Sequence, residues 1–144
     1  MGKHSFPSIL LSLPIYPAVR GIAVQFSKFM GVGAVGTLMH YLVLVVLVEL
    51  VGIEVLIGSS LGALVGALVN YVLNYRFTFA SSKRHHEALT KFLAVAGTSF
   101  LLNGAVMSLF SYHLGWPYLS AQVMSTLLML IWNFTANRVW TFAE

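Results

Sequence analysis

The chain has 144 residues, of which 58% are hydrophobic and only 8% are charged, and its mean hydropathy is +0.86. This composition excludes an ordinary soluble domain and predicts a membrane protein. The net charge of +4 does not indicate nucleic-acid binding, because the basic residues are scattered at the ends of apolar runs instead of forming one stripe. The chain has no cysteine, so disulfides and thiolate metal ligands are excluded.

The apolar runs predict the fold class, an all-α membrane protein with four transmembrane helices. Residues 1–25 hold three prolines, two of which we expect to break a short apolar segment and leave a cytoplasmic or interfacial tail. Uncharged runs follow at about 29–48 and 55–75. The uncharged stretch between Lys91 and Arg138 is long enough for two further spans. Helices are expected because the hydrocarbon core offers the backbone no hydrogen-bond partner.

Residues 26–144 are predicted to form one transmembrane domain that contains two tandem repeats. The offset along the sequence that pairs Lys28 with Lys91 also pairs Gly52 with Gly115. We therefore expect repeat one at 26–81 and repeat two at 89–144, each with two helices. Both repeats end in a polar signature that contains two Asn residues four apart, which places them on one helix face. These residues are Asn70, Asn74 and Arg76 in the first repeat, and Asn133, Asn137 and Arg138 in the second.

The positive charges predict the orientation of the chain in the membrane. All eight Lys and Arg residues fall in the tail, the middle loop or the C-terminal end. By the positive-inside rule, both termini are then cytoplasmic. Because each repeat has an even number of spans, the two repeats should be parallel and related by an axis along the membrane normal.

The paired amides and the two Arg residues are the candidate substrate-binding residues. At matching depths near the cytoplasmic interface they would form a polar site for an anionic lipid headgroup, since amides bond to phosphate and sugar oxygens and Arg grips phosphate with two bonds. Two structural alternatives stay open. The Asn side chains can bond across helices as packing contacts, and the Arg side chains can anchor the helices by snorkelling.

Two polar residues near mid-membrane, His40 and Asn103, are the candidates for a translocation path. Polar side chains at this depth normally face the interior of a helix bundle, and a purely structural pairing is the alternative. The small residues Gly58, Gly62 and Gly66 form a ridge that is typical of close helix packing. Four helices leave a monomer little interior, so a homodimer that meets along this ridge is a further expectation.

Catalytic chemistry is not indicated. The sequence has no Ser/His/Asp arrangement, no phosphate-binding glycine loop and no paired acidic residues in the apolar runs. His85 and His86 stand in a polar loop without further ligands nearby in the sequence, so neither a metal site nor a cofactor is expected. We expect a protein that is not an enzyme.

The signature at the end of the second repeat resembles that of the GtrA-like family of bacterial inner-membrane proteins. The second repeat meets the pattern Asn-x-x-x-Asn-Arg-x-Trp-Thr-Phe, and the resemblance extends from Phe26 to Phe142. The first repeat departs from the pattern, with Tyr75, Arg76 and Phe77 where the second has Arg138, Val139 and Trp140. The two halves would then contact a ligand unequally.

The resemblance implies a function in cell-surface polysaccharide synthesis. Members of this family are associated with moving or presenting polyprenyl-phosphate-linked sugars across the inner membrane. The resemblance thus implies a flippase whose partners are this lipid, membrane lipids and membrane glycosyltransferases. A non-transporting accessory protein that anchors a glycosyltransferase is one alternative. A small cation or multidrug exporter is another, but it would need a carboxylate in mid-span, and none lies there.

Overall fold

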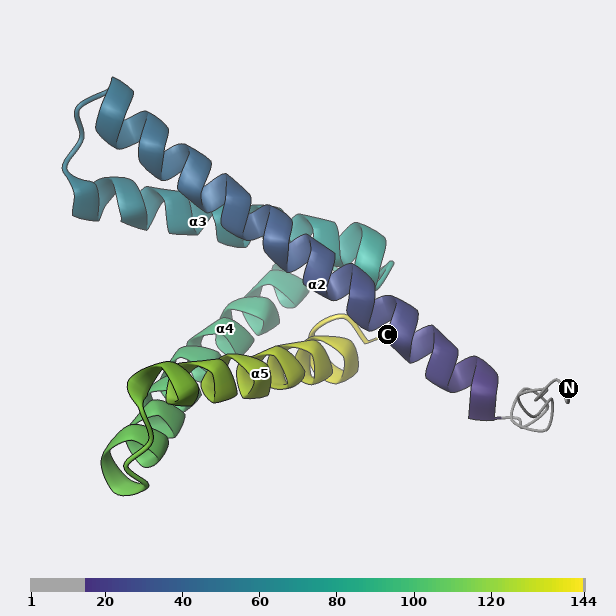
Figure 1. The fold of residues 1–144 in the computed structure, drawn as a ribbon. Helices are drawn as coiled ribbons and strands as arrows, with labels where there is room; N and C mark the ends of the chain where they lie inside the picture. Colours follow the sequence, from purple (N-terminus) through teal and green to yellow (C-terminus); the bar gives the residue numbers. More distant parts are fainter. Residues whose placement is uncertain (1–14, 144) are drawn as a thin grey trace, which may run out of the picture. The chain divides into compact units, whose positions relative to one another are not determined.

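The computed structural model describes residues 15–143, and every regular element in that range is a helix. The four α-helices labelled in Figure 1 are α2 (Ile15–Val45), α3 (Val55–Leu73), α4 (His85–Ser108) and α5 (Tyr118–Ala136). A five-residue π-helical segment continues each of them: η1 (Val46–Leu50), η2 (Asn74–Thr78), η3 (Leu109–His113) and η4 (Asn137–Thr141). The all-α class expected from the sequence is confirmed for this part of the chain.

Three helical stretches within the described residues are long and apolar enough to cross a membrane: Pro17–Leu50, Ile57–Thr78 and His85–His113. Large apolar side chains on these stretches point outward, as at Leu38 and Phe100, which are 66% and 79% exposed. Such a surface suits contact with lipid and not with water. The chain is therefore a membrane protein. The fourth expected span, α5, is not among the three stretches and carries the polar residues Gln122, Ser125 and Asn133.

The first helix begins earlier than the sequence suggests. Helix α2 starts at Ile15, inside the segment 1–25 that was expected to be a tail. Pro17 falls in its first turn, where a backbone N–H has no intrahelical partner and its loss costs nothing. The expected break at this proline is therefore wrong, and residues 15–25 extend the first span. Residues 1–14 of the expected tail lie outside the described part of the chain.

The bounds of the elements repeat with the period seen in the sequence. Helix α5 follows α3 at one constant offset, which takes the first residue from 55 to 118 and the last from 73 to 136. The same offset relates η1 to η3 and η2 to η4. Local backbone structure therefore recurs at the spacing that the sequence shows.

Left-handed residues close three of the helix ends. Gly52 (φ 78°), Ala80 (φ 46°) and Gly115 (φ 68°) each follow a π segment. The N–H of the next residue then bonds to a carbonyl oxygen six residues back, at 2.9 Å in each case. This arrangement is one residue longer than a Schellman motif, because a π segment precedes it, and it likewise satisfies helix carbonyls and needs a residue that tolerates positive φ. Glycine meets this need without strain at two of the three positions, and Ala80 does not.

The chain divides into two compact units at Gly66. In the first unit, residues 15–66, the start of α3 packs closely against α2 through the glycine ridge. A Cβ atom added at Gly62 would lie 2.6 Å from the carbonyl oxygen of His40, and one added at Gly66 would lie 2.6 Å from that of Gly36. The ridge is therefore a packing seam within the chain. It is already covered, so a homodimer would have to form through a different surface.

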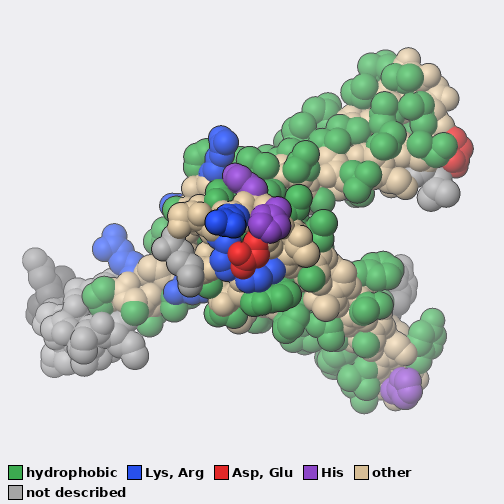
Figure 2. Space-filling model, turned by 180° about the vertical axis from the view of Figure 1, so that it is seen from behind, with side chains coloured by type: hydrophobic (Ala, Val, Ile, Leu, Met, Phe, Trp, Pro, Cys, Tyr) green, Lys and Arg blue, Asp and Glu red, His purple; other side chains and the backbone are tan. Residues whose placement is uncertain are grey.

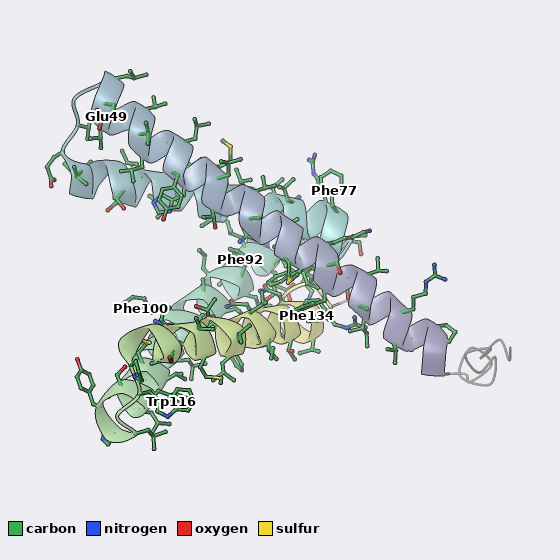
Figure 3. The ribbon with its side chains drawn as sticks, in the orientation of Figure 1. Glu49, Phe77, Phe92, Phe100, Trp116 and Phe134 are labelled. Carbon is green, nitrogen blue, oxygen red and sulfur yellow. The ribbon has the colours of Figure 1, made fainter. Side chains whose placement is uncertain are left out.

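The second unit, residues 67–143, holds the end of α3, the loop after it, and the paired helices α4 and α5, which run side by side (Figure 1). Its core is aromatic and lies where these elements meet: Tyr71, Ala88, Phe92 and Phe142 are buried together. Figure 3 labels Phe92 on α4 and Phe134 on α5, and it shows Trp116 at the turn between these two helices. The C-terminal residues are thus part of the packing and not an appendage.

Candidate functional site

The paired asparagines lie at the junctions between α-helix and π segment. Asn74 is the first residue of η2 and Asn137 is the first residue of η4. Both are buried, with 0% and 2% of their surface exposed, whereas Asn70 and Asn133 are half-buried one turn earlier. The π geometry is often found at functional sites because it breaks the regular hydrogen-bond ladder.

Each buried asparagine uses its amide nitrogen within its own helix. Nδ2 of Asn74 donates to Oδ1 of Asn70, and Nδ2 of Asn137 donates to the carbonyl oxygen of Asn133 at 2.8 Å. No described residue bonds the Oδ1 atom of Asn74 or Asn137, nor the hydroxyl oxygen of buried Thr141. Buried acceptors are normally satisfied, so three such atoms near the ends of the two signatures require an explanation. Each of these atoms can accept a hydrogen bond from a ligand or a water that reaches it.

Other predicted polar residues hold α4 against α5. Ser99 donates to Oδ1 of Asn133 at 2.8 Å, and Ser125 donates to Oδ1 of Asn103 at 2.6 Å. Both bonds link side chains across the two helices, as the structural alternative for the amides expected. Asn103 was predicted to lie on a translocation path, and in this conformation it is engaged in packing.

His40 belongs to the first unit, on α2. Its ring stacks on that of Tyr41 at a centroid distance of 5.4 Å, and it lies beside the glycine ridge. The Nε2 atom is buried and has no hydrogen-bond partner among the described residues. A buried polar nitrogen in this state is a feature that packing alone does not explain.

The two predicted arginines lie next to the buried asparagines, in the same π segments. Arg76 in η2 is exposed and Arg138 in η4 is half-buried. At the C-terminal end of a helix, a cation interacts favourably with the helix dipole, which is a structural role besides the snorkelling that was left open. The structure therefore places all six predicted headgroup residues at the C-terminal ends of α3 and α5.

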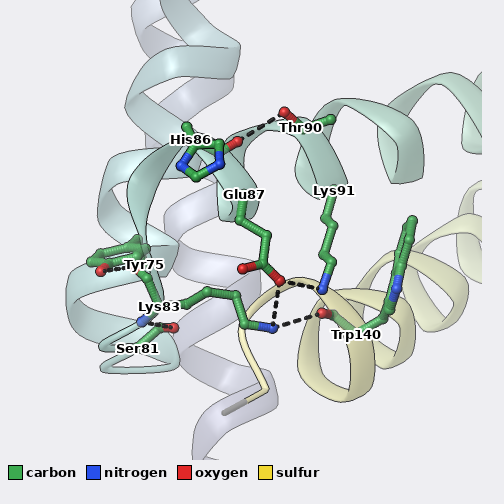
Figure 4. Close-up of polar contacts among 8 residues, drawn as sticks. All are labelled: Tyr75, Ser81, Lys83, His86, Glu87, Thr90, Lys91 and Trp140. Atoms are coloured by element: carbon green, nitrogen blue, oxygen red, sulfur yellow. Dashed lines mark hydrogen bonds and ion pairs between the residues drawn. The ribbon is translucent and has the colours of Figure 1, made fainter.

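The sequence reasoning missed a charged cluster formed by Lys83, Glu87 and Lys91. Oε1 of Glu87 lies 2.7 Å from the ammonium of Lys91 and 3.8 Å from that of Lys83 (Figure 4). Partial burial lowers the pKa of Lys83, and the neighbouring Lys91 ammonium lowers it further, while Glu87 acts in the opposite direction. The spacing of four residues between successive charges is the signal that could have revealed this cluster.

Trp140, in η4, contacts the charged cluster. Nζ of Lys83 donates to the carbonyl oxygen of Trp140 at 3.4 Å, and Nζ of Lys91 lies 5.7 Å from the centre of the indole (Figure 4). Figure 2 shows Lys, Arg and His side chains gathered around an acidic side chain on one face, while hydrophobic side chains cover most of the helices. The cluster is thus a polar area on an otherwise apolar surface.

Tyrosines hold the loop between α3 and α4 in place. The hydroxyl of Tyr71 lies 3.0 Å from Nδ1 of His85, and the hydroxyl of Tyr75 donates to the carbonyl oxygen of Lys83. The ring of Tyr75 also stacks on His85 at 4.3 Å. These contacts tie the loop, and with it Lys83, to the aromatic core.

An apolar groove of about 410 Å³ runs between α4 and α5 and continues to η4. Ala94, Val95 and Thr98 line it from α4, and Trp132, Ala136 and Trp140 line it from the other side. This volume is in the range of small-molecule sites. Trp140 therefore lines the groove and contacts the charged cluster.

Comparison with known proteins shows the family of the chain. No curated protein matches it significantly. The family described as GtrA/DPMS, transmembrane domain, matches residues 28–142. The match includes the paired asparagines, the charged cluster and the groove. Since it spans most of the chain, this protein belongs to the GtrA/DPMS transmembrane-domain family.

Proposed function

We propose that the protein moves a polyprenyl-phosphate-linked sugar across the bacterial inner membrane for the glycosylation of cell-surface polysaccharide. Membership of the GtrA/DPMS family indicates a role in polysaccharide or lipid-linked sugar biosynthesis, and this is the observation that carries the proposal. The cargo passes intact, with no bond made or broken, so the proposed protein is not an enzyme.

The asparagines are the proposed headgroup contacts. Asn74 and Asn137 have buried oxygens without described partners, and amide oxygens accept hydrogen bonds from sugar hydroxyls. Arg76 and Arg138, in the same π segments, are the proposed partners of the phosphate. Because both asparagines are buried, the helix ends must separate before the sugar reaches them. The described conformation is then the closed one, and His40 and Asn103 are the proposed residues of the path.

The proposal includes an orientation. The two repeats insert in parallel, four spans cross the membrane and both termini are cytoplasmic. The charge pattern of the sequence and the constant offset between the helix bounds of the two repeats support this arrangement. The polyprenyl tail stays in lipid while the headgroup crosses.

A second candidate is a non-transporting accessory protein that anchors a membrane glycosyltransferase. The description of the family as a transmembrane domain favours it, because a domain of this kind can serve to hold a partner at the membrane. This candidate predicts that loss of the asparagines harms complex formation and not lipid movement.

The test is reconstitution of the purified protein in liposomes that contain a polyprenyl-phosphate hexose. The rate at which inner-leaflet sugar becomes open to a membrane-impermeant oxidant is measured. The double variant Asn70→Ala/Asn133→Ala is expected to lose protein-dependent exposure. Ser99→Ala is the matched control, because it removes the same cross-helix bond to Asn133 and keeps the amide.

Two results would count against the proposal. Sugar exposure that does not depend on the protein for any lipid tested would reject translocation. Co-purification of a glycosyltransferase from native membranes, lost in the double variant, would then support the accessory function.

A further inference from the structure

The groove between α4 and α5 is suited to a hydrocarbon chain. Its lining is almost wholly apolar, and Trp132 and Trp140 stand on the same wall. The Thr98 hydroxyl donates to the carbonyl oxygens of Ala94 and Val95, so the polar atom of this residue is satisfied within its own helix. Apart from Thr135, the lining therefore requires no polar group of an occupant along the groove.

One end of the groove meets the two ammonium groups. Trp140 lines the groove, the Lys91 ammonium lies over its ring, and the Lys83 ammonium bonds to its carbonyl oxygen. Lys91 also lies on α4 one turn before Ala94, which is part of the lining. An occupant with an apolar chain and an anionic end would satisfy both parts of this surface at once.

Glu87 occupies the place that such an anion would take. Both ion pairs use the same carboxylate oxygen, so two cations share one acceptor atom. The Glu87 side chain is 44% exposed, and ion pairs at this exposure contribute little to stability. A phosphate offers several oxygens and can replace the carboxylate at little cost.

We propose that the phosphate of the polyprenyl-phosphate lipid docks between Lys83 and Lys91, with the first isoprene units of its chain in the groove between α4 and α5. Glu87 holds the two lysines in place when the lipid is absent and is displaced when it binds. This inference rests on the proposed function, because it takes its lipid from there. It adds an entry site that adjoins the second signature through Trp140 but does not use the asparagines.

The test is photo-crosslinking of the full-length protein in phosphatidylcholine nanodiscs. The probe is a short polyprenyl monophosphate with a diazirine on its second isoprene unit. Cross-links are expected on α4 and on the α5–η4 side of the groove. The variant Lys83→Gln/Lys91→Gln should reduce their yield about tenfold, since both charge-assisted contacts are lost. Glu87→Gln should raise the yield about threefold, because the competing carboxylate is removed.

Matched variants separate binding from folding. Lys83→Arg/Lys91→Arg keeps both charges and should form the cross-links as the unchanged protein does. Arg84→Gln removes an exposed charge from the same loop, outside the cluster, and should leave them unchanged. Ala94→Leu should block the groove and reduce cross-linking while the charged cluster stays intact.

Competing lipids identify the occupant. Unlabelled polyprenyl monophosphate should displace the probe, whereas polyprenol without phosphate and diacyl phosphatidic acid should not. Equal displacement by phosphatidic acid would overturn the proposal in favour of a general anionic-lipid site. Cross-links outside the groove, or cross-links that survive the loss of both lysines, would overturn it as well.

Two further outcomes separate the entry site from translocation. If the protein binds the probe in the groove but does not move sugar lipid, the entry site is supported and translocation is rejected. If the variant without Lys83 and Lys91 moves the lipid at the normal rate, translocation is supported and the entry site is rejected.

Discussion

Tyr71 and His85 are joined by two contacts: the tyrosine oxygen lies 3.0 Å from Nδ1 of the imidazole and 3.1 Å from the carbonyl oxygen of His85. A consistent assignment has the hydroxyl donating to the carbonyl and accepting from the ring N–H. The pair links α3 to the first residue of α4 across the loop. It therefore holds in place the segment of chain that carries Lys83 and Glu87.

Removing this link should loosen the loop. Tyr71→Phe keeps the ring in the aromatic core and deletes only the hydroxyl, so we expect a loss of about 1 kcal/mol in the free energy of unfolding. Unfolding by SDS in mixed micelles measures it. Tyr112→Phe, at a position that is 85% exposed, is the control and should change little. An equal effect of both substitutions would contradict the assigned role of Tyr71.

Alanine substitutions at different glycines should change stability by different amounts, according to the atoms that an added Cβ would meet. At Gly62 an added Cβ meets the backbone oxygen of His40, which cannot move alone, and Gly62→Ala should cost about 1–3 kcal/mol of stability. At Gly58 the nearest atom, at 2.9 Å, is the end of the Val48 side chain, which can rotate, so the loss should be smaller. Gly97 has open space around it and lies within α4, so Gly97→Ala should be neutral or stabilising. The order of unfolding midpoints tests this, and a neutral Gly62→Ala would disprove the close packing.

The left-handed residue Ala80 predicts a stabilising substitution. Its φ of 46° is strained for a residue with a Cβ, and Ala80→Gly should raise the free energy of unfolding by about 1 kcal/mol. Gly115→Ala places alanine at a φ of 68° and should lower stability by a similar amount. Thermal unfolding in detergent would show opposite shifts for these two variants. Shifts of the same sign would be inconsistent with the backbone described.

Thr141 should show a conflict between stability and function. Its hydroxyl is buried and has no described partner, so Thr141→Val should stabilise the closed conformation by about 1 kcal/mol. If the hydroxyl serves the sugar in the open state, the same variant should slow translocation in the liposome assay. Thr90→Val is the control, because the Thr90 hydroxyl is exposed and bonds within its own helix. A Thr141→Val protein that is more stable and equally active would remove this residue from the site.

Local features of the chain could be predicted from sequence because they depend on composition and short spacing. The apolar runs indicate the helices, Gly52 and Gly115 mark two turns, and the offset seen in the sequence recurs in the helix bounds. The sequence-based prediction makes the first helix too short because it treats Pro17 as a break, although proline is compatible with the first turn.

Contacts between distant segments could not be predicted in this way. The stacking of Phe79 on Phe142 at 4.9 Å joins equivalent positions of the recurring pattern, but the spacing along the sequence does not show that such positions touch. The charged cluster depends partly on such contacts, because Trp140 comes from the far end of the chain. The i, i+4 spacing of its charges can be seen in the sequence, but the position of the cluster beside the groove cannot.

The π segments explain why the signature has its spacing. A π-helical bond joins residues five apart, and the N–H of Phe79 bonds to the carbonyl of Asn74 just as that of Phe142 bonds to the carbonyl of Asn137, both at 2.9 Å. The interval from asparagine to phenylalanine is therefore the length of one hydrogen-bonded ring. Deleting a single residue inside it would return the turn to α-helical geometry and rotate everything beyond it by about 100°. The number of residues in this interval is therefore constrained by the backbone itself, independently of which side chains it carries.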